Sequence, residues 1–116
     1  MFRIGMFILQ TMRHAPESCP LGNSKNLDIV IQWFENLESL TAKYDIKVVG
    51  AWIDRAGHTS YVIFDASDRE AFSNFEMDPQ NIPIITINTI QKKVVTSIKE
   101  TLPFFKEYKA TNQQTP

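Results

Sequence analysis

One amphipathic helix pattern, flanked by β-rich segments, decides what this 116-residue chain can fold into. Between residues 24 and 44, apolar side chains recur every three or four positions, and polar side chains fill the positions between them. The apolar positions are Leu27, Val30, Ile31, Phe34, Leu37, Leu40 and Tyr44. A helix with one apolar stripe must bury that stripe against another layer. The sequence therefore predicts a helix that lies on a β-sheet.

The rest of the chain supplies the strands of that sheet. Four strands are predicted, at Phe2–Met12, Ile46–Asp54, Thr59–Asp65 and Ile84–Ile90. The short segment Arg55–His58 contains a glycine and joins the second and third strands, so these two strands are expected to form an antiparallel hairpin.

Two further helices are predicted from capping and periodicity. Ser67 followed by Glu70 matches the capping-box pattern, and Asp78-Pro79 breaks the short helix that this box begins. A third helix is expected from Val94 to Leu102, after which Pro103 opens a last turn. Residues 1–109 are thus assigned to a single domain, and the polar residues 110–116 to a disordered tail.

The element order βαββαβ, with an extra C-terminal helix, predicts an α+β, ferredoxin-like fold with a four-stranded antiparallel sheet. Both main helices then cover one face of the sheet. The first strand carries apolar groups on the other face as well, and Val49, Ala51 and Ile53 repeat the pattern in the second strand. A partner subunit is the simplest cover, so a homodimer or higher oligomer is expected. The alternative is that the C-terminal helix wraps back over this face.

Composition narrows the function classes. Twelve basic and thirteen acidic side chains give a net charge of -1, which argues against binding to nucleic acid or to an anionic membrane. One cysteine cannot form an internal disulfide, and the apolar run Ile4–Leu9 is too short to span a membrane and lacks a cleavage-site pattern. We expect a cytoplasmic location. The sequence also lacks a glycine-rich phosphate loop, a Gly-x-Ser-x-Gly elbow and a Cys-x-x-Cys pair.

The predicted topology brings together the chain's two histidines and its single cysteine. In this fold the first strand pairs with the third, so the end of one and the start of the other share an edge of the sheet. His14 and Cys19 follow the first strand, and His58 precedes the third. We therefore expect His14, Cys19 and His58 to converge.

A thiolate and two imidazoles suit one ion of zinc, copper or iron. The prolines of the loop, Pro16 and Pro20, would hold the ligands in a preset geometry, and a fourth position would be open to Glu17, Met12, water or substrate. The main hypothesis is a metal-binding protein for metal handling or redox chemistry. The spacing is not one of the established metal signatures, so the metal cannot be identified from it.

Other interpretations remain open, and the sequence does not decide whether the protein is an enzyme. In a cofactor-independent isomerase or monooxygenase, His14 or His58 would be the general acid or base and Cys19 a nucleophile. The substrate pocket for a small apolar molecule would be lined by Met6, Ile8, Phe34, Trp52 and Tyr61. A noncatalytic ligand-binding dimer is a third interpretation. All three site residues can also be purely structural, with Cys19 as a small buried hydrophobe.

The loop His14-Ala-Pro-Glu-Ser-Cys19-Pro20, together with Gly57-His58-Thr59, resembles a family of small proteins of uncharacterised function, several of them archaeal. The family lies within the dimeric α+β barrel superfamily, and its pattern is His-x-Pro-x-x-Cys-Pro. The resemblance covers about residues 2 to 100 and implies the fold and a dimer. The superfamily is similar in fold to cofactor-independent monooxygenases, muconolactone isomerases, haem-handling proteins and regulatory ligand domains, so the resemblance implies no single activity.

Overall fold

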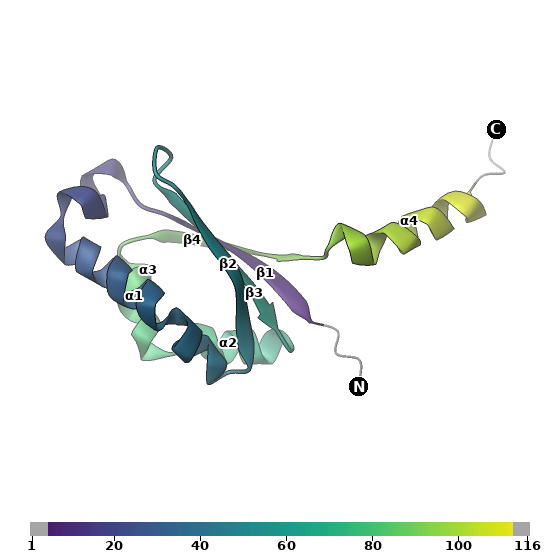
Figure 1. The fold of residues 1–116 in the computed structure, drawn as a ribbon, viewed down its shortest axis with the longest axis horizontal. Helices are drawn as coiled ribbons and strands as arrows, with labels where there is room; N and C mark the ends of the chain where they lie inside the picture. Colours follow the sequence, from purple (N-terminus) through teal and green to yellow (C-terminus); the bar gives the residue numbers. More distant parts are fainter. Residues whose placement is uncertain (1–4, 113–116) are drawn as a thin grey trace.

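A computed structural model describes residues 5–112 and contains one sheet with helices on one side (Figure 1). The strands are β1 (Met6–Arg13), β2 (Ile46–Asp54), β3 (Thr59–Ala66) and β4 (Thr89–Val95). They are antiparallel neighbours in the order β2-β3-β1-β4. This order confirms the predicted ferredoxin-like arrangement.

Three of the four helices cover one face of the sheet, and the fourth extends away from it (Figure 1). The helices are α1 (Ser24–Ala42), α2 (Arg69–Glu76), α3 (Ile82–Thr86) and α4 (Ile98–Thr111). Two 3-10 turns precede α1, namely η1 (Pro16–Ser18) and η2 (Pro20–Gly22). A third, η3 (Pro79–Asn81), precedes α3. In the part of the chain that the structure describes, no helix combines the length and apolar character that crossing a membrane requires.

The core lies between the sheet and helices α1, α2 and α3. Alternate residues of β1 and β3 point into it, and the apolar stripe of α1 lies over them. The buried apolar residues are Ile8, Met12, Trp33, Leu37, Leu40, Ile46, Val62, Phe64, Ala66, Phe72, Phe75 and Ile84. The rings of Phe64, Phe72 and Phe75 pack with centroids 5.3 to 5.5 Å apart, which fixes α2 on the sheet.

The first two helices begin at side-chain caps. The Asn23 side chain accepts a hydrogen bond from the Asn26 backbone amide at the start of α1. At α2 the predicted cap is wrong by one residue. Asp68, rather than Ser67, accepts from the Ala71 amide, because Asp68 is the last extended residue before the helix.

The last third of the chain departs from the prediction. The segment Ile84–Ile90 was expected to be a strand, but α3 occupies its first residues and β4 begins only at Thr89. Pro83 lies at the beginning of α3, where a missing amide hydrogen costs nothing, and Ile84 is 2% exposed in the core. The β-branched composition was thus overridden by packing and by proline at a helix start.

The third predicted helix begins later than expected. Val94 and Val95 belong to β4, where they pair with β1, and α4 starts after the Ser97 cap. Pro103 lies inside α4 and does not open a separate turn. The helix ends at Thr111, two residues into the segment expected to be disordered; residues 113–116 of that segment lie outside the described residues.

A bulge in β2 changes which face its side chains occupy. The register of β2 against β3 shifts between Val48 and Gly50. After the shift, Ala51 lies opposite Val62 and Ile53 opposite Ser60. These positions share the face covered by α1, so the prediction that Ala51 and Ile53 face the other side is wrong.

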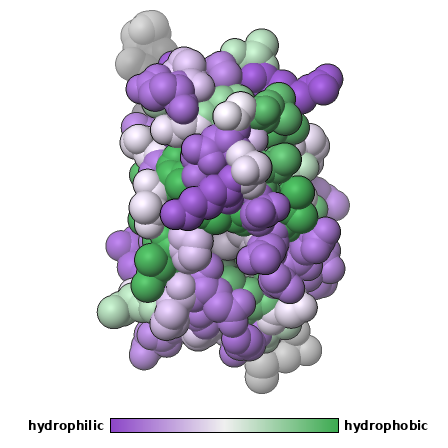
Figure 2. Space-filling view, turned by 90° about the vertical axis from the view of Figure 1, so that its left-hand side faces the viewer, coloured by the Kyte–Doolittle hydropathy of each residue, from purple (hydrophilic) through white to green (hydrophobic). Residues whose placement is uncertain are grey.

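Large apolar surfaces remain uncovered on the described chain. The sheet face opposite the helices, here called the bare face, carries Phe7, Leu9, Tyr61, Ile63 and Val95. Helix α4 has no buried residue, and it exposes Ile98, Leu102, Phe104, Phe105 and Tyr108. The C-terminal helix therefore does not wrap over the sheet. The end of the molecule opposite α4 also shows hydrophobic side chains between hydrophilic ones (Figure 2).

A buried hydrogen-bond chain ties α1 to the segment after α2, and its loss should destabilise the fold. The Trp33 indole nitrogen donates to the Asn81 side-chain oxygen at 2.9 Å. The Asn81 side-chain nitrogen in turn donates to the Phe75 carbonyl at 2.6 Å. Trp33→Phe leaves the Asn81 oxygen without its donor, which should lower the free energy of unfolding by about 1–3 kcal/mol. Urea denaturation followed by circular dichroism measures this loss.

Trp52→Phe is the matched control for this prediction. Trp52 is 56% exposed, so the same replacement there should change the free energy of unfolding by no more than about 0.5 kcal/mol. Equal losses in the two variants would contradict the role assigned to the Trp33–Asn81 hydrogen bond.

Candidate functional site

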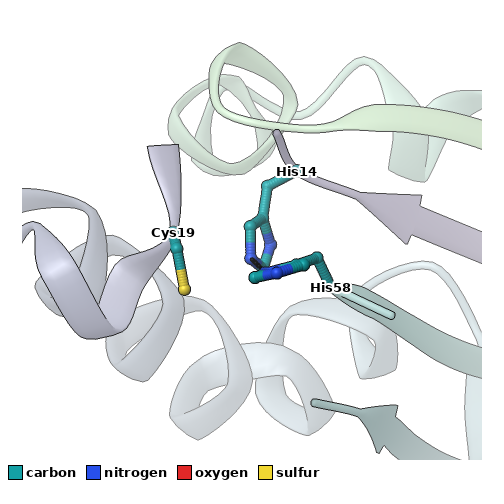
Figure 3. A group of neighbouring side chains, drawn as sticks. All are labelled: His14, Cys19 and His58. Atoms are coloured by element: carbon teal, nitrogen blue, oxygen red, sulfur yellow. Dashed lines mark hydrogen bonds between the residues drawn. The ribbon is translucent and has the colours of Figure 1, made fainter. Parts of the chain in front are cut away.

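Three side chains converge at the edge of the sheet where β1 ends and β3 begins (Figure 3). His14 follows β1, His58 precedes β3, and Cys19 lies between η1 and η2. One ligand atom from each residue can be chosen so that all three lie within 4.8 Å of one another. The predicted convergence of His14, Cys19 and His58 is therefore present in the structure.

The two histidines are positioned by the pairing of β1 with β3. The ladder ends at Arg13 opposite Thr59, and the His14 backbone amide adds one more hydrogen bond to the His58 carbonyl at 3.2 Å. The imidazoles then meet edge to face, with 3.1 Å between His14 Nε2 and His58 Nδ1. One of these nitrogens donates and the other accepts, so each ring fixes the tautomer of the other.

The hairpin turn holds His58 in a conformation that few side chains adopt. Its φ is 53°, in the left-handed region. The Asp54 carboxylate accepts from the Gly57 amide at 3.0 Å, and the Thr59 hydroxyl donates to the Gly57 carbonyl at 2.8 Å. These contacts hold the turn in place despite its cost. Such a residue motivates a functional hypothesis, because the strain persists only where its surroundings enforce it.

Cys19 is held in place by two 3-10 turns and by a hydrogen bond between its loop and α1. It lies between two 3-10 turns, each opened by a proline, and its amide donates to the Pro16 carbonyl at 3.2 Å. The loop is fastened to α1 because the buried Asn26 side chain donates to the Ser18 carbonyl at 2.9 Å. Cys19 is half-buried, with its sulfur directed toward the imidazoles, so it is not a hydrophobe enclosed in the core (Figure 3).

The environment of His14 favours the neutral imidazole. Burial removes solvent from the ring and lowers the pKa of His14 below its ordinary value of 6.5, and the nearby His58 lowers it further by charge repulsion. A neutral ring carries the lone pair that a metal ligand or a general base needs. His14 is therefore ready for either role at neutral pH.

The other polar groups expected near the site do not join it. Among the described residues, the group of candidate metal ligands contains only the two histidines and Cys19. Glu17 is exposed, and the Asp54 carboxylate accepts the hydrogen bond from the Gly57 amide in the hairpin turn. Met12 is 2% exposed within the core. A fourth ligand from Glu17, which the sequence left open, is thus not part of the arrangement.

The expected apolar pocket is divided in the structure. Met6 and Ile8 line a cavity against α2 and β4, whereas Phe34 and Trp52 line a separate groove between α1 and β2. Tyr61 lines neither of these two spaces. The strand order separates these residues, because β3 lies between β1 and β2.

Comparison with known proteins gives a distant structural similarity. No protein-family model matches the sequence, and no curated protein matches it either. The chain is similar to the crystal structure of a mutant of SnoaB, a cofactor-independent oxygenase from Streptomyces nogalater. The identity is 15%, the TM-score is 0.48, and the match covers 80% of this chain and 92% of that one.

The lowered pKa of His14 predicts how the stability of the metal-free protein depends on pH. Unfolded His14 takes up a proton near its ordinary pKa of 6.5, and folded His14 does so only at lower pH. The unfolded state therefore binds more protons in this window, and stability should fall as the pH decreases from 6.5 through the folded pKa. Melting temperatures measured between about pH 7.5 and pH 5.5 test this, with chelator present.

His14→Gln is the informative variant, because glutamine retains a polar side chain that does not titrate. Its melting temperature should depend less on pH over this range than that of the unmodified protein. An unchanged pH dependence would show that His14 does not contribute to it.

Proposed function

We propose that this chain is a small metal-binding protein whose ion is held by His14, Cys19 and His58. The observation that carries the proposal is the approach of their three ligand atoms to within 4.8 Å of one another. Thiolate and imidazole together suit zinc, copper and iron better than calcium or magnesium, which prefer oxygen ligands.

The spacing of the imidazole nitrogens supports this function. Two nitrogens bound to one tetrahedral zinc ion lie about 3.3 Å apart, and a sulfur and a nitrogen about 3.6 Å apart. The distance between His14 Nε2 and His58 Nδ1 is 3.1 Å. An ion can therefore replace the hydrogen bond without separating the two nitrogens, provided that the rings turn until both lone pairs point at it. The Cys19 sulfur lies within 4.8 Å of a nitrogen of each ring.

The number of ligands suggests what the ion would do. Three protein ligands leave one position of a tetrahedral site for water or substrate, as in catalytic zinc centres. All three side chains are half-buried, so a small molecule can reach them. His14 is held neutral and need not lose a proton when it binds the ion. Metal handling and redox chemistry at the open position both fit this arrangement.

A second candidate function is cofactor-independent proton transfer on a small apolar substrate. The direct hydrogen bond between His14 and His58 supports it, because one ring can orient the other as a general acid or base. The lowered pKa of His14 keeps this ring unprotonated near neutral pH, as a general base must be. A noncatalytic ligand-binding dimer gains no specific support from the site.

We also propose that the protein acts as a homodimer in the cytoplasm. A second copy that packs on the bare face would cover Phe7, Leu9 and Ile63, which no described element covers. The apolar side of α4 needs a similar cover, since an isolated helix of 14 residues is marginal in water. A reducing cytoplasm would keep Cys19 as a thiol able to bind metal.

Metal analysis tests the main proposal. Untagged protein purified without chelator should carry about one ion per chain by inductively coupled plasma mass spectrometry. His14→Gln, Cys19→Ser and His58→Asn should each weaken binding by about tenfold or more, since each removes a ligand. Asparagine is chosen at position 58 because it tolerates the left-handed backbone. Glu17→Gln, in the same loop, is the control and should bind normally.

Two results would overturn the metal-binding function. One is a protein that stays metal-free after reconstitution with zinc, copper and iron. The other is unchanged affinity in all three ligand variants. Either would favour the proton-transfer function, in which activity survives exhaustive chelation and is lost with a histidine.

Light scattering after size-exclusion chromatography tests the dimer. The expected mass is twice the 13.3 kDa of one chain. Ile63→Glu places a charge in the middle of the bare face and should shift the protein to the monomer. Ile82→Glu is the control, because Ile82 is 61% exposed on α3, away from the bare face, and should leave the dimer intact. A monomer of the unmodified chain at micromolar concentration would refute the proposal.

A further inference from the structure

An apolar groove of about 270 Å³ runs between α1 and the edge strand β2. It is lined by Val30, Phe34, Ala51, Trp52, Ile53 and Ser60. No charged side chain is among the lining residues, and Ser60 supplies the only side-chain hydroxyl. The groove therefore suits an uncharged, apolar occupant.

The groove exists because of the β2 bulge. The register shift after Val48 turns Ala51 and Ile53 toward α1, and the small side chain of Ala51 leaves space there. Ile53 remains 60% exposed. Apolar surface left open in a hollow is typical of a binding site, because water there is released when an apolar ligand enters.

One wall of the groove leads to the candidate site along β3. Ser60 is two residues from His58, which corresponds to about 7 Å along a strand. Ser60 also pairs with Met12, two residues before His14. The groove and the histidines thus lie at successive positions along the same pair of strands.

The other wall leads to the site along α1. Val30 lies one helical turn after Asn26, and residues four apart share a side of a helix. The Asn26 side chain holds the carbonyl of Ser18, the neighbour of Cys19. Both walls therefore run toward His14, Cys19 and His58 from different parts of the chain.

We propose that this groove binds the apolar body of a small substrate or ligand, and that the ligand's polar end reaches the His14–Cys19–His58 site. This inference rests on the proposed function and adds the class of molecule to it. The ligand is an uncharged molecule of one or two rings with a single ligating or ionisable group. Phe34 offers an aromatic face for a ring.

The test compares two probes that differ only in a ring for the groove. Imidazole and 4-phenylimidazole are titrated into the Co²⁺-loaded protein, and the visible cobalt absorption reports coordination. 4-Phenylimidazole should bind about tenfold more tightly or better, because its phenyl ring is buried in the groove. Ala51→Phe fills the groove and should remove this advantage while cobalt still binds. Ala110→Phe, the same replacement on exposed α4, should preserve it.

A second variant guards against misfolding of Ala51→Phe. Ile53→Ser removes an exposed apolar wall of the groove without touching the core, and it should also reduce the preference for 4-phenylimidazole. An equal preference in the unmodified protein and both groove variants, with cobalt bound in all, overturns the groove inference and leaves the metal proposal standing.

Failure of the metal proposal would be recognised separately, because cobalt would not bind at all. The groove is then tested without metal by amide chemical shifts on addition of 4-phenylimidazole. Shifts at Val30, Phe34 and Ser60 that disappear in Ala51→Phe support the groove. Shifts that are absent, or that persist in this variant, overturn it.

Discussion

The antiparallel pairing of β1 with β3 is the interaction on which both the core and the candidate site depend. Its register places Ile8 opposite Phe64 under the helices, and the same register brings His14 beside His58. A slip of one residue would move every buried side chain of β1 to the bare face. The burial of the core thus fixes the position of the histidines, and the site needs no separate device to align them.

The sequence predicts those features that depend on local periodicity and turn chemistry. The helix at α1, the hairpin at Arg55–His58 and the strand order are recovered. The stripe of α1 is wrong at one position, because Ile31 is 43% exposed and Trp33 is buried instead. The strand predicted at Ile84–Ile90 fails because its β-branched residues favour a strand locally, whereas burial of Ile84 and the position of Pro83 favour α3. The β2 bulge is a property of pairing between strands, so no single segment reveals it.

The candidate site was predictable for a related reason. Topology alone brings His14 and His58 together, because both adjoin paired strands. It places Cys19 only in the loop after β1. The contact that fastens this loop, from the Asn26 side chain to the Ser18 carbonyl, is a tertiary hydrogen bond that residue types do not disclose. The left-handed backbone of His58 is equally a product of the folded hairpin.

The anchoring of Cys19 bears on the choice between the two proposed functions. A pair of hydrogen-bonded histidines suffices for proton transfer and has no need for a thiol at a fixed position. A metal site needs its sulfur ligand near both imidazoles before the ion arrives, since ordering a loose loop would weaken binding. The two proline-opened turns and the Asn26 contact restrict Cys19 in this way. The chain therefore orders the residue that distinguishes a metal centre from a histidine pair, which is why we rank metal binding first.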